Sequence, residues 1–147
     1  MNHQCPECRS TEFAVRSEAE QFKRKGQEFW VEVDYSVCQH CGYEVIFPDQ
    51  IKRNDCRLRD AWRKMDGLLT GQEILDLRNQ LNLTQQDAAK IFGGGINAFS
   101  KYERGEVIQS VAMDKLMRIA LEFPLAFDAL KRRDVGTSKL PSHQDFC

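Results

Sequence analysis

The sequence contains no long apolar run. No stretch approaches the roughly 18 consecutive apolar residues that a membrane-spanning helix needs, so a transmembrane protein is excluded. The first residues also lack the basic and apolar regions of a secretory signal, and we therefore expect the protein to stay in the cytoplasm. Because thiols are kept reduced there, clustered cysteines are better explained as metal ligands than as disulfides.

Neither basic nor acidic residues are in clear excess. Lys and Arg number 21 and Asp and Glu 22, which gives a formal net charge of −1, and no segment of the chain is a polycation. A nucleic-acid-binding protein of this composition has to rely on a few well-placed contacts. Its affinity for DNA should therefore depend only modestly on salt.

Catalytic residue sets are also missing. The sequence shows no Ser-His-Asp set, no paired carboxylates and no phosphate-binding loop, because the glycines at 93–95 follow a predicted helix and not a strand. We therefore expect a protein that is not an enzyme. The enzymatic alternative is an oxidoreductase working through Cys5 and Cys8, which would require thiols that titrate and turn over.

Four of the six cysteines form two C-x-x-C pairs, Cys5 with Cys8 and Cys38 with Cys41. Two intervening residues allow a tight turn to aim both sulfurs at one point, and two such turns supply the four thiolates of a tetrahedral zinc site. Since all four ligands are protein thiolates, no position stays open for water or substrate, so we predict one structural Zn²⁺ per chain. A redox pair is the alternative, but thioredoxin-type pairs usually occur once, at a strand-to-helix junction.

The cysteine pairs enclose a β-rich module over residues 1–48. Alternating apolar and polar residues predict strands over 11–19 and 28–37, separated by a turn at 23–27, and a short strand over 43–47. So small a module has too little interior to fold by apolar burial alone, and the metal has to contribute to its stability. With four thiolates available, His3 and His40 are expected to be exposed and not to bind the metal.

Residues 49–69 form a predicted connector helix, which runs from Asp49 to Asp66 and ends at Gly67. Its apolar residues have the spacing of an amphipathic helix that packs one stripe on a neighbour: Ile51, Leu58, Ala61, Trp62 and Met65. Cys56 lies on this helix without a partner nearby in the sequence, and is expected to be a small, partly buried side chain.

Residues 70–132 form a predicted all-α domain. Capping boxes at Thr70 and Thr84 open two helices, which end near Leu81 and Phe92. Three glycines then make a turn, and further helices are predicted over 96–104, 111–123 and 125–132. Residues 133–147 lack periodicity and are expected to be disordered. The fold class is therefore α+β, a small β-rich four-cysteine zinc domain followed by an all-α helix-turn-helix domain.

Two short helices joined by a glycine turn are typical of the helix-turn-helix, whose second helix lies in the major groove of DNA. Ile96, Phe99 and Tyr102 are expected to face the interior. The opposite face then carries four polar residues: Asn97, Ser100, Lys101 and Arg104. An Asn amide can pair with adenine, and a Lys can donate to guanine or to phosphate. Thr84 and Gln85 stand at the start of the preceding helix, where backbone amides suit a phosphate.

This domain resembles the Xre/Cro-type repressors in the stretch from Leu77 to Ala89 and again from Phe99 to Gly105. The segment Ile91-Phe92-Gly93-Gly94-Gly95-Ile96-Asn97-Ala98-Phe99-Ser100-Lys101-Tyr102-Glu103 resembles, more narrowly, the recognition segment of the MqsA family of antitoxins. The two cysteine pairs match the zinc-binding amino-terminal domain of that family. The two similarities occur in the same order as in the family and together cover residues 5–130.

The resemblance implies the antitoxin of a type II toxin-antitoxin system, a DNA-binding repressor of its own operon. It implies a toxin, typically an endoribonuclease, bound by the zinc domain, and a homodimer that forms through the carboxy-terminal domains on a palindromic operator. In the family the equivalents of Asn97 and Lys101 read bases. Lys101 is a departure, because the family usually has Arg there and Lys cannot reproduce the planar fork of Arg.

A second hypothesis is a solitary or prophage-derived zinc-containing helix-turn-helix regulator that has no toxin partner. A neighbouring reading frame for a small toxin would distinguish the two hypotheses.

Overall fold

The computed structural model describes residues 3–134 of the chain. These residues form two compact units that divide between Gly67 and Leu68. Within the described residues the first unit contains a three-stranded sheet, four clustered cysteines and one helix, and the second contains five helices. The predicted fold class, a small four-cysteine β domain followed by a helical domain, is confirmed. Among the helices of residues 3–134, none combines the length and the apolar composition of a membrane span.

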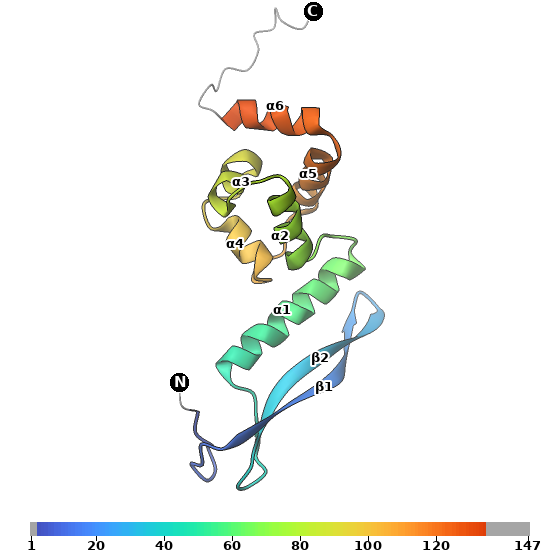
Figure 1. The fold of residues 1–147 in the computed structure, drawn as a ribbon. Coiled ribbons are helices and arrows are strands. Elements are labelled where there is room, and N and C mark those ends of the chain that lie inside the picture. Colours follow the sequence, from blue (N-terminus) through green and yellow to red (C-terminus); the bar gives the residue numbers. More distant parts are fainter. Residues whose placement is uncertain (1–2, 135–147) are drawn as a thin grey trace, which may run out of the picture. The chain divides into compact units, whose positions relative to one another are not determined.

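The first unit is built on a long antiparallel hairpin of β1 (Phe13–Arg24) and β2 (Gln27–Cys38), drawn in blue in Figure 1. Lys25 and Gly26 form its two-residue turn, and both have positive φ, 52° and 78°, as the twist of a hairpin favours. The first strand extends five residues beyond the predicted end at Ala19. Four of these five residues are polar and only Phe22 is apolar, so they show little alternation, yet each of them pairs with a residue of β2.

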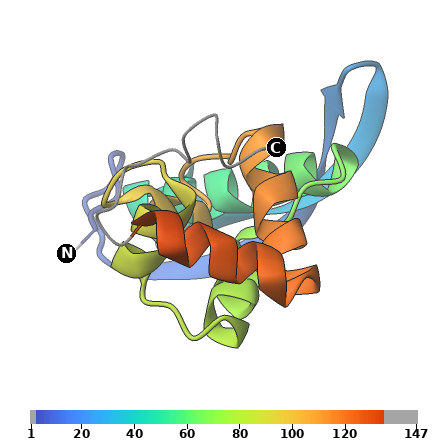
Figure 2. The same cartoon turned by 90° about the horizontal axis from the view of Figure 1, so that it is seen from above.

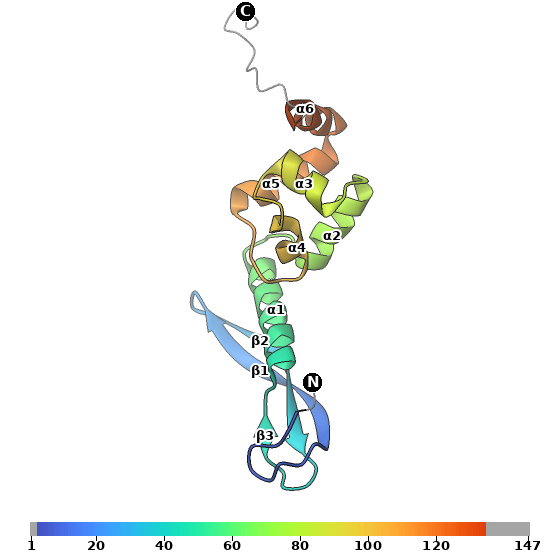
Figure 3. The same ribbon diagram turned by 90° about the vertical axis from the view of Figure 1, so that its left-hand side faces the viewer.

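The third strand is shorter than the predicted range 43–47. It comprises only β3 (Glu44–Val45), which pairs with β2 through Ser36 and Val37. Figure 3 shows β3 beside β2 at the end of the hairpin that carries the cysteines. This short pairing returns the chain past Cys38 and places the second C-x-x-C turn at the end of the sheet.

Helix α1 (Pro48–Met65) packs on β2 within the first unit (Figure 1). Its first turn is fixed by Gln50, which is buried, accepts a hydrogen bond from the Phe47 backbone at 3.0 Å and donates to Ser36 Oγ at 2.9 Å. The predicted apolar stripe is wrong at its start, because Ile51 is 47% exposed. Side-chain hydrogen bonds from this end of the helix to β2 replace the expected apolar contact.

The second unit consists of α2 (Gly71–Gln80), α3 (Gln85–Phe92), α4 (Ala98–Glu103), α5 (Val111–Glu122) and α6 (Pro124–Asp134). Figure 2 shows α6 turning back from the end of α5, and α6 packs on both α5 and α3. Of the residues expected to be disordered, 133 and 134 belong to α6, and the others, Cys147 included, lie outside the described residues.

Side-chain caps open the first two helices of this unit. Thr70 Oγ1 accepts from the Glu73 backbone at 3.3 Å while Glu73 Oε1 accepts from the Thr70 backbone at 3.4 Å, which is the predicted capping box. Thr84 Oγ1 accepts from the Asp87 backbone at 3.1 Å. Side chains from four helices then fill one apolar core, which includes Ile74, Leu77, Ala88, Phe92, Phe99, Met117 and Ala120.

Helices α2 and α4 approach each other closely at Gly71. A Cβ atom placed on Gly71 would lie 2.5 Å from the backbone oxygen of Glu103, so a larger residue would push the two helices apart. The absence of a side chain therefore sets the position of the C-terminal end of α4 in this unit.

Helix α4 begins later than the predicted start at Ile96. Gly93, Gly94 and Gly95 have φ values of 94°, 99° and 88°, and the first helical residue is Ala98. Ile96 thus precedes the helix and is 67% exposed, which contradicts the prediction that it faces the interior. Phe99 is fully buried as predicted, and Tyr102 packs on it edge to face at 5.6 Å between ring centroids.

Candidate metal centre and nucleic-acid interface

The four cysteines of the two C-x-x-C pairs meet at one point of the first unit. All four sulfurs lie within 4.8 Å of one another, and two of the separations, Cys5 to Cys41 and Cys8 to Cys38, are 3.5 Å. A tetrahedral zinc ion with Zn–S bonds of about 2.3 Å requires sulfurs about 3.8 Å apart. The cluster therefore fits a tetrahedral metal ion with four thiolate ligands.

The two turns that carry the cysteines have the same backbone pattern. In the first, the Arg9 backbone donates to the Cys5 carbonyl and the Cys5 backbone to the Ser10 carbonyl, at 2.9 and 2.8 Å. In the second, the amide of Gly42 donates to the Cys38 carbonyl and that of Cys38 to the Tyr43 carbonyl, both at 2.9 Å. Each turn closes through a residue with positive φ, at position 9 and at position 42. The sequence thus presents two equivalent ligand pairs to one ion.

Backbone N–H groups favour a thiolate at Cys38. Hydrogen bonds from the backbone of Cys41, and then of His40, lower the pKa of the Cys38 thiol to about 6. At Cys41 the backbone of Tyr43 acts in the same direction, but desolvation and the three other thiols outweigh it and raise the pKa of Cys41 to about 12. A bound cation would stabilise the thiolate form of all four cysteines.

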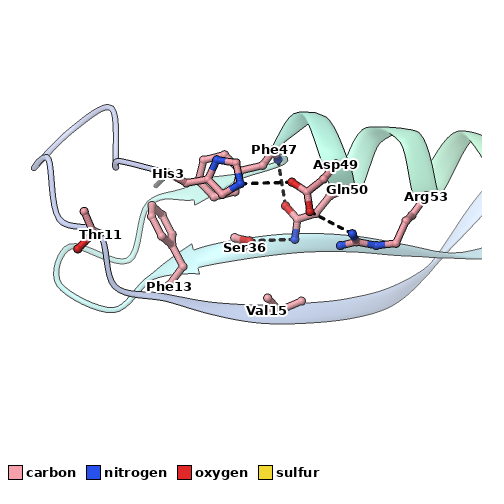
Figure 4. A pocket seen from close by; sticks show the side chains of 9 residues that line it. All are labelled: His3, Thr11, Phe13, Val15, Ser36, Phe47, Asp49, Gln50 and Arg53. Carbon is pink, nitrogen blue, oxygen red and sulfur yellow. Dashed lines mark hydrogen bonds and ion pairs between the residues drawn. The ribbon is translucent and has the colours of Figure 1, made fainter. Parts of the chain in front are cut away.

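His3 does not join the cysteine cluster. Its ring stacks on Phe47 with 3.9 Å between centroids, and its Nε2 lies 3.3 Å from Asp49 Oδ1 (Figure 4). These contacts leave His3 half-buried at the edge of a pocket of about 290 Å³, so the expectation that it is exposed is wrong; His40 is exposed. His3 fixes the segment before Cys5 against the start of α1.

A buried carboxylate ties β2 to α1 in the first unit, and sequence patterns did not single it out. Asp34 is 8% exposed and accepts hydrogen bonds from Arg57 at 2.7 Å, Ser17 at 3.0 Å and Arg53 at 3.2 Å. Arg57 contributes most to lowering the pKa of Asp34 to about 2. Asn54 pairs with both backbone groups of Asp34, at 2.8 and 2.9 Å. These contacts support the sheet on which Cys38 is carried.

In the second unit, α3, the turn of three glycines and α4 follow one another along the chain. Asn97 directly precedes α4 and Lys101 lies on it, and both side chains are exposed. They line one shallow hollow together with Ile96 and Val107. An amide just before α4 and an ammonium group on its last turn therefore both reach solvent at one hollow.

The other four residues predicted to bind DNA are half-buried or have polar partners within the protein. Thr84 is exposed but uses its hydroxyl to cap α3, and Arg104 is exposed and lies 3.3 Å from Glu106. Ser100 is half-buried on α4. Gln85 is half-buried and donates its amide N–H to Glu103 Oε2 at 2.7 Å, so this part of its side chain already has a partner inside the protein.

Glu103 lies at the centre of the contacts that hold α4. Besides the bond from Gln85, its two oxygens accept from Nε and Nη2 of Arg78, and Arg78 also donates to the Leu83 carbonyl at 2.8 Å. Both partners are mostly buried, with 13% and 7% of their side chains exposed. Sequence patterns gave no sign of this ion pair, because its partners lie on different helices.

The chain is similar in sequence to known proteins. The family model described as the antitoxin component of the bacterial toxin-antitoxin system, MqsA, matches residues 3–131 of the chain. The curated Antitoxin MqsA of Escherichia coli (strain K12) is 26% identical over 122 residues, which cover 82% of this chain and 93% of that protein. The range matched by the family model extends over parts of both units. The chain therefore belongs to the MqsA family of antitoxins, regulatory proteins of bacterial toxin-antitoxin systems that are not enzymes.

Proposed function

We propose that this antitoxin is a repressor of its own operon that binds double-stranded DNA through the second unit. The observation that carries the proposal is the exposure of Asn97, directly before α4, and of Lys101 on α4, while Phe99 anchors the same helix in the core. Asn can pair with the major-groove edge of adenine, and Lys can donate to guanine or to phosphate. The proposed DNA-binding domain spans residues 70–132, with residues 49–69 as a connector helix after the domain of residues 1–48.

The supporting DNA contacts come from the remaining polar residues around α4: Thr84, Gln85, Ser100 and Arg104. We assign them to the phosphate backbone, because such contacts position a protein on DNA without requiring an outward-facing amide. A single short helix gives little affinity, so the protein acts as a homodimer through its carboxy-terminal domain on an inverted repeat. Few cationic contacts are involved, and the slope of affinity against salt should be modest.

The first unit has two proposed roles. Its four cysteines hold one structural Zn²⁺, since a closed set of four thiolates suits zinc and leaves no open position for chemistry. Its outer surface between residues 12 and 47 binds the toxin. Val15 and Trp30 support this assignment, because both are about two-thirds exposed and an exposed Trp is a common centre of protein interfaces. In the cytoplasm the protein would then meet both toxin and DNA.

A mobility-shift assay on the DNA upstream of the gene tests the repressor function. We expect Asn97→Ala to lose the preference for that duplex over a scrambled one, while keeping its metal content and circular dichroism. Asn79→Ala is the matched control, because Asn79 is also an exposed Asn of the second unit but lies on α2. Equal preference in wild type and Asn97→Ala would remove Asn97 as a base-reading residue.

A co-expression assay tests the antitoxin function separately. The small reading frame next to the gene should arrest growth when expressed alone, and the full chain should restore growth and co-purify with its product. A neighbouring product that neither arrests growth nor binds the chain would favour the solitary regulator.

A further inference from the structure

The second unit exposes a large apolar side chain, that of Ile96, directly before α4, and the partly exposed Val107 lines the same hollow. Ile96 is 67% exposed, although Ala98 and Phe99, two and three residues later, are buried. A single exposed aliphatic residue on a protein surface is ordinary. The position of this one is informative, because it lines the same hollow as Asn97 and Lys101.

The backbone before Ile96 leaves this side chain isolated. Gly93, Gly94 and Gly95 carry no side chains, and a Cβ atom at Gly93 or Gly95 would meet nothing within 4 Å. Gly94 lies against α4, where an added Cβ would come within 3.0 Å of the Ala98 Cβ. The three glycines are therefore bare on their open side, and Ile96 is the first side chain after them that projects into solvent. A duplex edge can approach such a turn closely.

Apolar atoms are scarce on the major-groove edge of DNA. Among the four bases only thymine presents an apolar group there, its C5-methyl, and aliphatic side chains recognise it by direct contact. Consecutive Cα atoms are about 3.8 Å apart, close to the rise of about 3.4 Å per base pair. Neighbouring residues such as Ile96 and Asn97 can therefore reach the same base pair or adjacent ones.

We propose that Ile96 is a specificity-determining residue that contacts a thymine methyl group beside the adenine paired with Asn97. This inference rests on the proposed DNA-binding function and adds a third base contact to Asn97 and Lys101. It gives the exposure of Ile96 a role, since contact with the methyl would remove the apolar side chain from water. The recognised step then contains thymine next to, or opposite, the adenine.

Replacing thymine by uracil in the upstream duplex tests the proposal, because it removes only the methyl group. Full-length wild type, Ile96→Ala, Ile96→Val and the control Ile51→Ala are titrated against both duplexes and a scrambled duplex. Ile51 is a matched isoleucine, 47% exposed, on the first unit. Uracil is introduced in one symmetric pair of positions at a time, and circular dichroism, zinc content and sedimentation without DNA are recorded for each variant.

We expect wild type and Ile51→Ala to lose about fourfold in affinity for each contacted methyl group that is removed. This loss should appear at only one symmetric pair of positions in the duplex. Ile96→Ala should bind the thymine and uracil duplexes equally, and Ile96→Val should keep most of the difference. Wild type that prefers its upstream duplex but ignores every methyl, or Ile96→Ala that still senses the methyl, would overturn the role of Ile96 and leave the repressor proposal standing.

Two other outcomes would assign Ile96 to a different role or reject the DNA-binding function itself. If Ile96→Ala changes sedimentation without DNA and keeps the methyl effect, the residue belongs to an interface between copies of the chain. If wild type does not distinguish the upstream duplex from the scrambled one, the proposed function fails and the role of Ile96 fails with it.

Discussion

Arg78 on α2 and Glu103 on α4 form a two-point ion pair inside the second unit, with Nε donating to Oε1 and Nη2 donating to Oε2 at 3.2 Å. A paired guanidinium and carboxylate fix both distance and orientation, which a single contact cannot do. The same carboxylate accepts from Gln85 on α3. Three helices therefore converge on one acid, and the short α4 obtains its orientation from this acid as well as from the buried Phe99.

Removing Arg78 should destabilise the second unit and weaken DNA binding together. Arg78→Ala leaves Glu103 buried without its cation, which costs about 3 kcal/mol. Asp128→Asn is the control, because it breaks an exposed pair with Lys131 and should change stability by less than about 0.5 kcal/mol. Urea unfolding, followed by NMR signals of the second unit, measures the stability of both variants. Equal midpoints for the two variants would contradict the role of the ion pair.

Asp34→Asn should destabilise the first unit by about 2 kcal/mol. The pKa of Asp34 is 3.8 in the unfolded chain and about 2 in the folded protein, and this difference stabilises the folded state by about 2 kcal/mol at neutral pH. Asp55→Asn is the control, because Asp55 is half-exposed and its oxygen lies 3.9 Å from Arg59. Urea titration of the metal-loaded chain at pH 7 measures the difference by fluorescence. Both tryptophans, Trp30 and Trp62, lie in the first unit. A loss no larger than that of Asp55→Asn would show that the cluster around Asp34 stabilises nothing.

The second unit should become less stable in acid through Asp114. Burial alone would raise the pKa of Asp114, but hydrogen bonds from the Leu69 backbone, Gln109 and Arg118 outweigh it and lower the pKa below 3.8. The charged form thus contributes stability that is complete above pH 3.8 and is lost as the pH falls through the lower folded value. Asp114→Asn should therefore cost about 2 kcal/mol at pH 7.

The difference between Asp114→Asn and wild type should shrink as the pH falls below 3.8, and it should vanish below the lower folded pKa of Asp114, where both side chains are neutral. Asp76→Asn serves as the control, because Asp76 is exposed on α2. NMR-detected urea unfolding of the second unit across pH 2.5 to 7 follows the trend, and a cost that stays constant over this range would contradict the assignment.

Loss of one metal ligand should unfold the first unit alone. Structural zinc sites contribute on the order of 10 kcal/mol at neutral pH, which exceeds what so small a unit can supply by apolar burial. Cys38→Ser should therefore lose the metal and the fluorescence of the folded first unit, as should a strong chelator. Cys56→Ser is the control, because Cys56 lies on α1 outside the cluster. Stoichiometric metal in Cys38→Ser would contradict a four-thiolate site.

Sequence patterns located the features that are determined locally. A C-x-x-C spacing dictates its own turn, so Cys5, Cys8, Cys38 and Cys41 could be assigned to one cluster before the fold was known. The capping box at Thr70 is local in the same way, and it marked the start of α2 to within one residue.

Features that depend on contacts between elements were missed. Helical periodicity predicts that Ile96 faces the interior of the domain. This periodicity does not apply there, because Ile96 follows a turn of three glycines with positive φ. Asp34 looked like a solvent-facing residue of an alternating strand, and only the arginines of α1 make it a buried acid. Ile51 fitted an apolar stripe, but the buried Gln50 beside it makes the contact with β2.

Footprinting of the upstream DNA with the full-length, metal-loaded chain tests most directly whether the exposed start of α4 reads DNA. We expect two protected segments related by two-fold symmetry, with centres one helical turn, about 34 Å, or a multiple of it apart. Asn97→Ala should abolish this protection at protein concentrations where Asn79→Ala retains it. Protection that is absent, or that is unchanged in Asn97→Ala, would contradict the assignment of α4 as the recognition element.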